Sequence, residues 1–122
     1  MGTPDGISVV DGGDADPTSA DGLALLARLL DADPADVRTF DHQAGAGQDD
    51  PPHVHTEALV AWIVHGTIAF AGGPGLDQRV EVGPGQLVRV DADVPHAERV
   101  VGDEPLHAVI AHVRDFEVRP LP

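Results

Sequence analysis

The chain has 122 residues, of which 42% are hydrophobic, and this is enough apolar material for the core of one domain. A formal net charge of −14 repels phosphate groups, so nucleic acids and anionic membrane surfaces are not expected partners. The absence of cysteine excludes disulfides, thiolate metal sites and cysteine nucleophiles, which leaves imidazole and carboxylate groups as metal ligands.

The N-terminal segment, residues 1–17, is rich in Gly and Asp. We expect it to be flexible and acidic, with at most a short strand at residues 7–10. A secretory signal is not expected, because no basic stretch precedes an apolar one, and the longest apolar run is too short to span a membrane. A cytoplasmic protein is therefore the expectation.

One short amphipathic helix is predicted near residues 20–30. Leu23, Leu26 and Leu30 share one face of it, and Pro34 ends the helical pattern. Its N-terminus can be capped by side-chain oxygens, from Thr18, Ser19 or Asp21.

After the helix, short apolar runs alternate with turn signals about every ten residues, which is typical of an antiparallel sandwich or barrel. The expected strands are residues 37–42, 53–65, 67–70, 78–82, 87–90, 96–101 and 106–113. Turns rich in Gly, Pro and Asp separate them, at residues 45–47, 49–52, 72–75, 83–85 and 102–103. Residues 18–122 are thus expected to form a single all-β domain that includes the helix.

The run from residue 53 to residue 65 would present two faces as a regular strand. One face would carry His53, His55, Glu57, Leu59, Ala61 and Ile63, and the other Val54, Ala58, Val60, Trp62 and Val64. Both faces are largely apolar, so both need a cover, which the Leu-rich helix or a second subunit could supply on the outside. A homodimer is the expected assembly.

Three histidines form the strongest functional signal. His53 and His55 would lie on one face of a strand, about 6–7 Å apart along the backbone, and His96 begins another predicted strand. Two ligands from one strand and one from another can hold a single divalent ion and leave coordination positions open. Imidazole accepts Fe, Zn, Mn, Ni or Cu, so the identity of the metal stays open.

In spacing, the first pair resembles a signature motif of the cupin superfamily. That motif is a Gly, five residues, His-x-His, three or four residues, Glu, six residues and Gly. Here Gly47, His53, His55 and Gly66 fit without a gap, but Leu59 stands in the place of the Glu.

The third histidine resembles the second cupin motif, which is a Gly, five residues, Pro-x-Gly, two residues, His, three residues and Asn. Gly85 and His96 fit this spacing. Asp91 and Asp93 replace the Pro and the second Gly, and Val100 replaces the Asn.

The resemblance covers residues 40–115 and implies an antiparallel double-stranded β-helix, the jelly-roll barrel of cupins. It also implies a site of three histidines that lacks the glutamate of many relatives. Such three-histidine sites occur in some cupin dioxygenases that use ferrous iron.

Two other carboxylates could act in place of the missing glutamate. Glu57 and Glu98 each stand two residues beyond a proposed ligand, so each faces the same interior if its strand is regular. Either is a candidate metal ligand or a catalytic base. The alternative is that the strand bends and the side chain meets water at the rim.

The remaining histidines are weaker candidates. His65 is expected at a surface turn and His42 on an exposed strand position. Of His107 and His112, only one can point inward from a regular strand, and we favour His112 as the one in or near the cavity.

Three functions are open at this point. A metal-dependent oxidoreductase of the dioxygenase type, acting on a small organic molecule, is the first. The second is metal-assisted isomerase, cyclase or lyase chemistry with Glu57 or Glu98 moving a proton. The third is a non-catalytic module that binds a small ligand.

Overall fold

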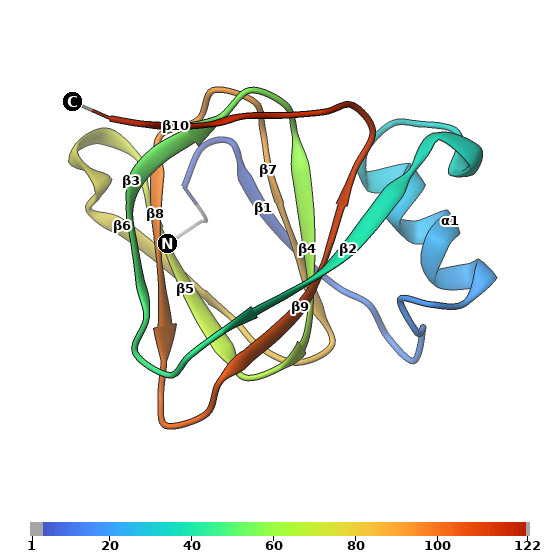
Figure 1. Cartoon of the computed structure of the whole chain (residues 1–122), viewed down its shortest axis with the longest axis horizontal. Coiled ribbons are helices and arrows are strands. Elements are labelled where there is room, and N and C mark those ends of the chain that lie inside the picture. Colours follow the sequence, from blue (N-terminus) through green and yellow to red (C-terminus); the bar gives the residue numbers. More distant parts are fainter. Residues whose placement is uncertain (1–3, 122) are drawn as a thin grey trace.

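The computed structural model describes residues 4–121, which form two antiparallel five-stranded sheets facing each other (Figure 1). The strands are β1 (Ile7–Asp11), β2 (Arg38–Ala44), β3 (Asp49–His55), β4 (Leu59–His65), β5 (Thr67–Gly72), β6 (Gln78–Val82), β7 (Gln86–Val90), β8 (His96–Val101), β9 (Leu106–His112) and β10 (Val118–Pro120). The helices are α1 (Ala20–Leu29) and two short 3₁₀ turns, η1 (Pro34–Asp36) and η2 (Pro74–Leu76).

The strand order is β1-β7-β4-β9-β2 in the first sheet and β10-β3-β8-β5-β6 in the second. This confirms the predicted all-β double-stranded β-helix with one short α-helix. Among residues 4–121, no helix is both long and apolar enough to cross a membrane.

The helix α1 covers the outer face of the first sheet (Figure 1). Ser19 caps it, because its hydroxyl accepts a hydrogen bond of 3.0 Å from the backbone N–H of Gly22. Leu26 is fully buried in a cluster with Val60 and Trp62 of β4. The predicted need for a helical cover on this strand is therefore met.

The predicted continuous strand from residue 53 to residue 65 is wrong. The chain bends between His55 and Leu59, and the two halves belong to different sheets, as β3 and β4. Thr56 fixes the bend: its backbone N–H donates to the carbonyl of Glu117, and its hydroxyl accepts from the N–H of Glu117. Because the alternation is broken here, Glu57 does not continue the face of the histidines.

The beginning of β3 was expected to be a turn, and this is also wrong. Asp49 and Asp50 pair with Arg99 and Glu98 of β8, and the register then shifts between Asp50 and His53, as in a β-bulge. Pro51 and Pro52 have no N–H to donate to a ladder, which explains the interruption. The bulge lets both Asp50 and His53 face the interior although they are three residues apart.

The termini extend both sheets. The strand expected at residues 7–10 is β1, which pairs with β7 and buries Ile7 in the core; residues 1–3 of the expected flexible segment lie outside the described part. At the other end, β10, which the sequence did not predict, pairs with β3 and places Val118 opposite His55.

The core between the sheets does not fill the whole barrel. Buried side chains from both sheets pack against one another there, including Ile63, Val82, Val88 and Val100. Ile63 and Leu106 belong to this core and also line a cavity. The candidate site lies in that cavity.

Candidate metal centre and its cavity

Four side chains of the second sheet converge on one point. His53, His55, His96 and Glu98 each offer a ligand atom, and these atoms lie within 4.8 Å of one another. His53 lies directly opposite His96 in the β3–β8 ladder, with ring centroids 4.3 Å apart. The three predicted ligands are thus brought together from two neighbouring strands.

Backbone carbonyls orient two of the rings. His53 Nδ1 lies 2.7 Å from the carbonyl oxygen of Pro51, and His96 Nδ1 lies 2.8 Å from that of Val94. Since a carbonyl oxygen only accepts, each Nδ1 carries the proton and each Nε2 keeps a free lone pair. This arrangement is typical of metal-binding histidines, whose second nitrogen donates to a backbone oxygen.

Buried nitrogens without a partner indicate that the cluster is built for a cation. His55 Nδ1 and His96 Nε2 are buried and make no hydrogen bond, and the latter lies 3.4 Å from Glu98 Oε1. Leaving such atoms unpaired costs about 1–3 kcal/mol each. Three imidazoles and one carboxylate suit a divalent transition metal, so these residues fit the implied ion.

The electrostatics keep the cluster in its metal-binding form at neutral pH. Burial and, to a smaller extent, the positive charge of a protonated His96 together lower the pKa of His55 to about 4. Burial alone would raise the pKa of Glu98, but the contact with His96 and the neighbouring imidazoles outweigh it and lower this pKa. His55 is therefore neutral and Glu98 ionised, as ligation requires.

Of the two carboxylates proposed from the sequence, the structure brings only Glu98 to the histidines. It supplies the carboxylate that the cupin motif places at Leu59, and Leu59 instead lines the cavity. Glu57 lies in the bend after β3, where its carboxylate is 3.7 Å from the guanidinium of Arg114. A role for Glu57 at the metal is thus not supported by its position.

Asp50 is a site residue that the sequence reasoning missed. It pairs with Glu98 across β3 and β8, and it lines the cavity. Burial raises its pKa, and the nearby carboxylate of Glu98 raises it further. The pair Pro51-Pro52 is the sequence signal that could have revealed Asp50, because two prolines interrupt the strand pairing and reverse the alternation of faces.

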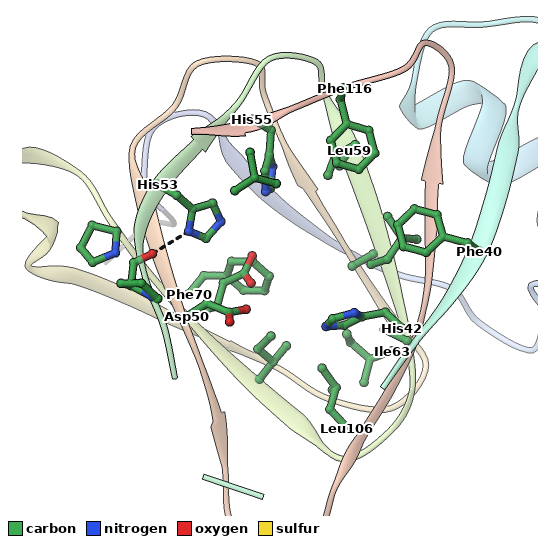
Figure 2. A pocket seen from close by; sticks show the side chains of 18 of the residues that line it. Phe40, His42, Asp50, His53, His55, Leu59, Ile63, Phe70, Leu106 and Phe116 are labelled. Carbon is green, nitrogen blue, oxygen red and sulfur yellow. Dashed lines mark hydrogen bonds between the residues drawn. The ribbon is translucent and has the colours of Figure 1, made fainter. Parts of the chain in front are cut away.

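Three residues of the candidate metal cluster, His53, His55 and Glu98, line one side of a cavity of about 500 Å³. This volume lies within the range of small-molecule sites, roughly 300–1,000 Å³. Apart from the cluster and Asp50, the wall is almost entirely apolar (Figure 2), with Phe40, Pro51, Pro52, Leu59, Ala61, Ile63, Ile68, Phe70, Leu106, Ala108, Ile110, Phe116, Val118 and Pro120.

His42 also lines this cavity, so its predicted exposed position is wrong. The strand β2 runs on to Ala44, which is buried in the core, and the alternation of faces turns Phe40 and His42 inward with it. His42 therefore faces the cavity from the first sheet, whereas the metal cluster belongs to the second (Figure 2).

The other histidines lie outside the cavity. His65 is exposed and pairs with Glu104 at 2.8 Å, which confirms the predicted surface position. His107 contacts Asp41 at 3.1 Å. His112 does not line the cavity, but its ring contacts two aromatic residues that do.

Comparisons with known proteins agree with this architecture. The polyketide cyclase RemF from Streptomyces resistomycificus matches with a TM-score of 0.61 at 17% identity, over 70% of this chain and 61% of that one. A cupin-2 domain containing protein from Shewanella frigidimarina matches with a TM-score of 0.54 at 19% identity, over 68% and 76% of the two chains.

The DMSP lyase DddQ from Ruegeria pomeroyi matches with a TM-score of 0.55 at 27% identity, over 66% of this chain but only 39% of the lyase. The chain thus spans less than two thirds of both named enzymes. No curated protein sequence matches it. The family model described as "Cupin domain" matches residues 42–112, more than half of the chain, and the chain therefore belongs to the cupin domain family.

Proposed function

We propose that the protein is a metal-dependent enzyme that acts on a small, largely apolar organic molecule. The observation that carries this proposal is a buried cluster of three imidazoles and one carboxylate that opens directly onto an apolar cavity. A divalent ion held by His53, His55, His96 and Glu98 would supply Lewis acidity, which polarises a carbonyl or enol oxygen.

The chain itself contributes positioning and proton exchange. The apolar walls exclude water and hold the carbon skeleton of a substrate, so that an oxygen of the substrate meets the metal cluster. Facing the cluster from the first sheet, His42 is a candidate acid or base for a proton of the bound substrate. Asp50 is a second candidate beside Glu98.

For the reaction class we favour proton-transfer chemistry without net oxidation, such as cyclisation or elimination. His42 and Asp50 are two acid–base groups in the same cavity as the metal cluster, which suits such chemistry. Among the similar structures, RemF is described as a cyclase and DddQ as a lyase. The dioxygenase reaction expected from the sequence resemblance gains no support from these comparisons, so it takes second place.

The test is to load purified protein with Zn²⁺, Mn²⁺ or Fe²⁺ and to follow a panel of β-diketones, flavonols and thiols. We expect conversion of a carbonyl substrate under nitrogen with no dependence on oxygen, and its loss in the Glu98→Gln variant. Oxygen uptake in the presence of a substrate, seen only with the Fe²⁺-loaded protein, would instead indicate a dioxygenase reaction. Tight binding without turnover, unchanged after removal of the metal, would show a non-catalytic binding protein.

A further inference from the structure

We propose that the ligand of this cavity is a planar, uncharged aromatic or conjugated molecule that binds with one face against the rings of Phe40 and Phe116. The inference rests on the proposed function, since it assigns the substrate class of the same cavity. The evidence is the arrangement of these two phenyl rings at the cavity. Neither ring belongs to the cupin motifs or to the metal cluster.

Phe40 and Phe116 form one continuous aromatic wall. Their ring planes differ by only 18°, and their centroids are 6.4 Å apart. Figure 2 shows the two rings side by side and nearly face on, both lining the cavity. Phe40 is still 42% exposed, so part of this wall is open for a ligand to cover. A flat ring system is the ligand shape that would contact both rings at once.

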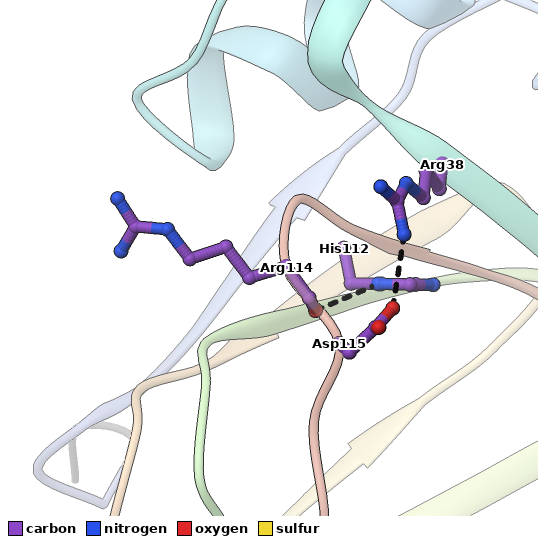
Figure 3. Close-up of polar contacts among 4 residues, drawn as sticks. All are labelled: Arg38, His112, Arg114 and Asp115. Atoms are coloured by element: carbon purple, nitrogen blue, oxygen red, sulfur yellow. Dashed lines mark hydrogen bonds and ion pairs between the residues drawn. The ribbon is translucent and has the colours of Figure 1, made fainter.

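A third ring braces this wall from behind. His112 meets Phe40 at 5.8 Å and 64°, and Phe116 at 5.2 Å and 74°, both edge-to-face contacts. Its own ring is held by a hydrogen bond of 3.0 Å from Nδ1 to the carbonyl oxygen of Arg114 (Figure 3). The wall is therefore ordered before any ligand binds, which lowers the entropy lost on binding.

The segment that carries Phe116 is also tied to the barrel on both sides. On one side, Arg38 Nη1 of β2 lies 2.9 Å from Asp115 Oδ1 (Figure 3). On the other, the N–H of Glu117 donates to the hydroxyl of Thr56 at 2.8 Å. The exposed ion pair adds little energy, but together these contacts fix where the ring stands.

The wall leads directly to the metal cluster. The ring of Phe116 lies 6.0 Å from that of His55, at an angle of 66°. A flat molecule on the wall can thus direct an oxygen at its edge toward the cluster. Asp50 and Glu98 in the cavity, and the net charge of −14, disfavour an anionic ligand. An uncharged molecule with oxygen at its edge fits best.

A second copy of the chain is the competing occupant, because Phe40 and Val118 line the cavity and are both apolar and exposed. We favour the small molecule, since both phenyl rings line the cavity and do not point away from it. Binding of a second copy would be detected as a change in the oligomeric state of the Phe40→Leu variant.

The test compares naphthalene-2,3-diol with decahydronaphthalene-2,3-diol, which carries the same two oxygens on saturated, non-planar rings. Isothermal titration calorimetry is carried out on chelator-treated protein, because the more acidic aromatic diol would chelate a bound Zn²⁺ better whether or not it contacts the phenyl rings. We expect about tenfold tighter binding of the aromatic diol. Phe40→Leu and Phe116→Leu keep apolar bulk but remove the ring face, and each should reduce this preference to about twofold. Phe40→Tyr should retain it. Val64→Ala, on an exposed residue outside the cavity, is the control.

Equal affinity for the two diols in the wild type overturns the inference. So does a Phe40→Leu variant that changes the oligomeric state but keeps the diol preference, because the rings would then serve an interface. The same titrations on the metal-free His96→Ala variant separate this inference from the proposed function. A preference that persists there supports the aromatic wall, even if the wild type proves unable to bind metal.

Discussion

Asp50 on β3 lies directly opposite Glu98 on β8, so a second carboxyl group stands beside the carboxylate of the metal cluster. Their pKa values move in opposite directions: burial and the charge of Glu98 raise that of Asp50, whereas the imidazoles lower that of Glu98. When two carboxyl groups are in contact, the negative charge of one disfavours ionisation of the other. The pair thus leaves Glu98 ionised for the metal, while Asp50 keeps its proton to a higher pH.

The two glutamates proposed from the sequence provide a matched pair of variants. Glu98→Gln removes an ionised ligand from the cluster, so we expect affinity for Zn²⁺ to fall at least about tenfold. Glu57→Gln changes the same side chain in the bend beside Arg114 and should leave the affinity unchanged. Competition with a chromophoric chelator measures both. Similar losses in the two variants would contradict the assignment of Glu98.

A substitution of His42 tests catalysis separately from metal binding. If it exchanges a proton with the substrate, His42→Gln should lower kcat by roughly 10²–10⁴-fold, with the metal content unchanged. His65→Gln, on an exposed histidine at the end of β4, is the control and should keep full activity. Elemental analysis and kinetics on the same preparations check the result. Unaltered kcat in His42→Gln would remove this residue from the mechanism.

The buried imidazoles predict that the metal-free protein weakens in mild acid. The pKa of His55 is about 4 in the folded chain, because of burial and the charge of His96, against about 6.5 when unfolded. Between these values only the unfolded chain binds the proton, so the free energy of unfolding decreases as the pH falls from about 6.5 to about 4. The decrease is at most about 3.5 kcal/mol, from a pKa difference of about 2.5 at ~1.4 kcal/mol per unit.

Urea denaturation of chelator-treated protein at pH 7.5 and pH 5 measures this decrease. Because other groups also titrate in this interval, the comparison is with His55→Gln, which should lose less stability between the two conditions. Zn²⁺ should stabilise the wild type at pH 7.5 and do so less at pH 5, since protons compete for the imidazoles. An identical pH dependence in both proteins would show that His55 is not buried in a neutral form.

The features that the sequence could predict are those that repeat or have fixed spacing. Turns about every ten residues predicted the antiparallel barrel, and the His-x-His pair with His96 predicted the cluster. Ligand convergence followed because two strands that pair in register bring His53 and His96 opposite each other. These relations depend on strand geometry alone, which varies little between sheets.

The features that could not be predicted depend on where the alternation of faces breaks and on where a strand ends. A bulge at Pro51 and Pro52 turns Asp50 inward, and a bend held by Thr56 moves Glu57 away from the histidines. The inward position of His42 depends on β2 running two residues beyond its predicted end. Each is a local departure of one to three residues that a period of two cannot reveal.

The helix supplies a prediction about stability that is independent of the metal. Leu26 is fully buried against Val60 and Trp62 of β4, so Leu26→Ala should lower the free energy of unfolding by about 2–5 kcal/mol. Leu23 was predicted to share its face, but it is only half-buried and lies outside this cluster.

The Leu23→Ala variant is therefore the matched control and should lose clearly less stability, because fewer neighbouring atoms surround the deleted carbons. Urea denaturation of both variants in the metal-free form measures the difference. Metal affinity should be unchanged in the folded fraction of each, since α1 covers the outer face of the first sheet and the ligands belong to the second. Equal destabilisation by the two substitutions would mean that the helix packs through a different face.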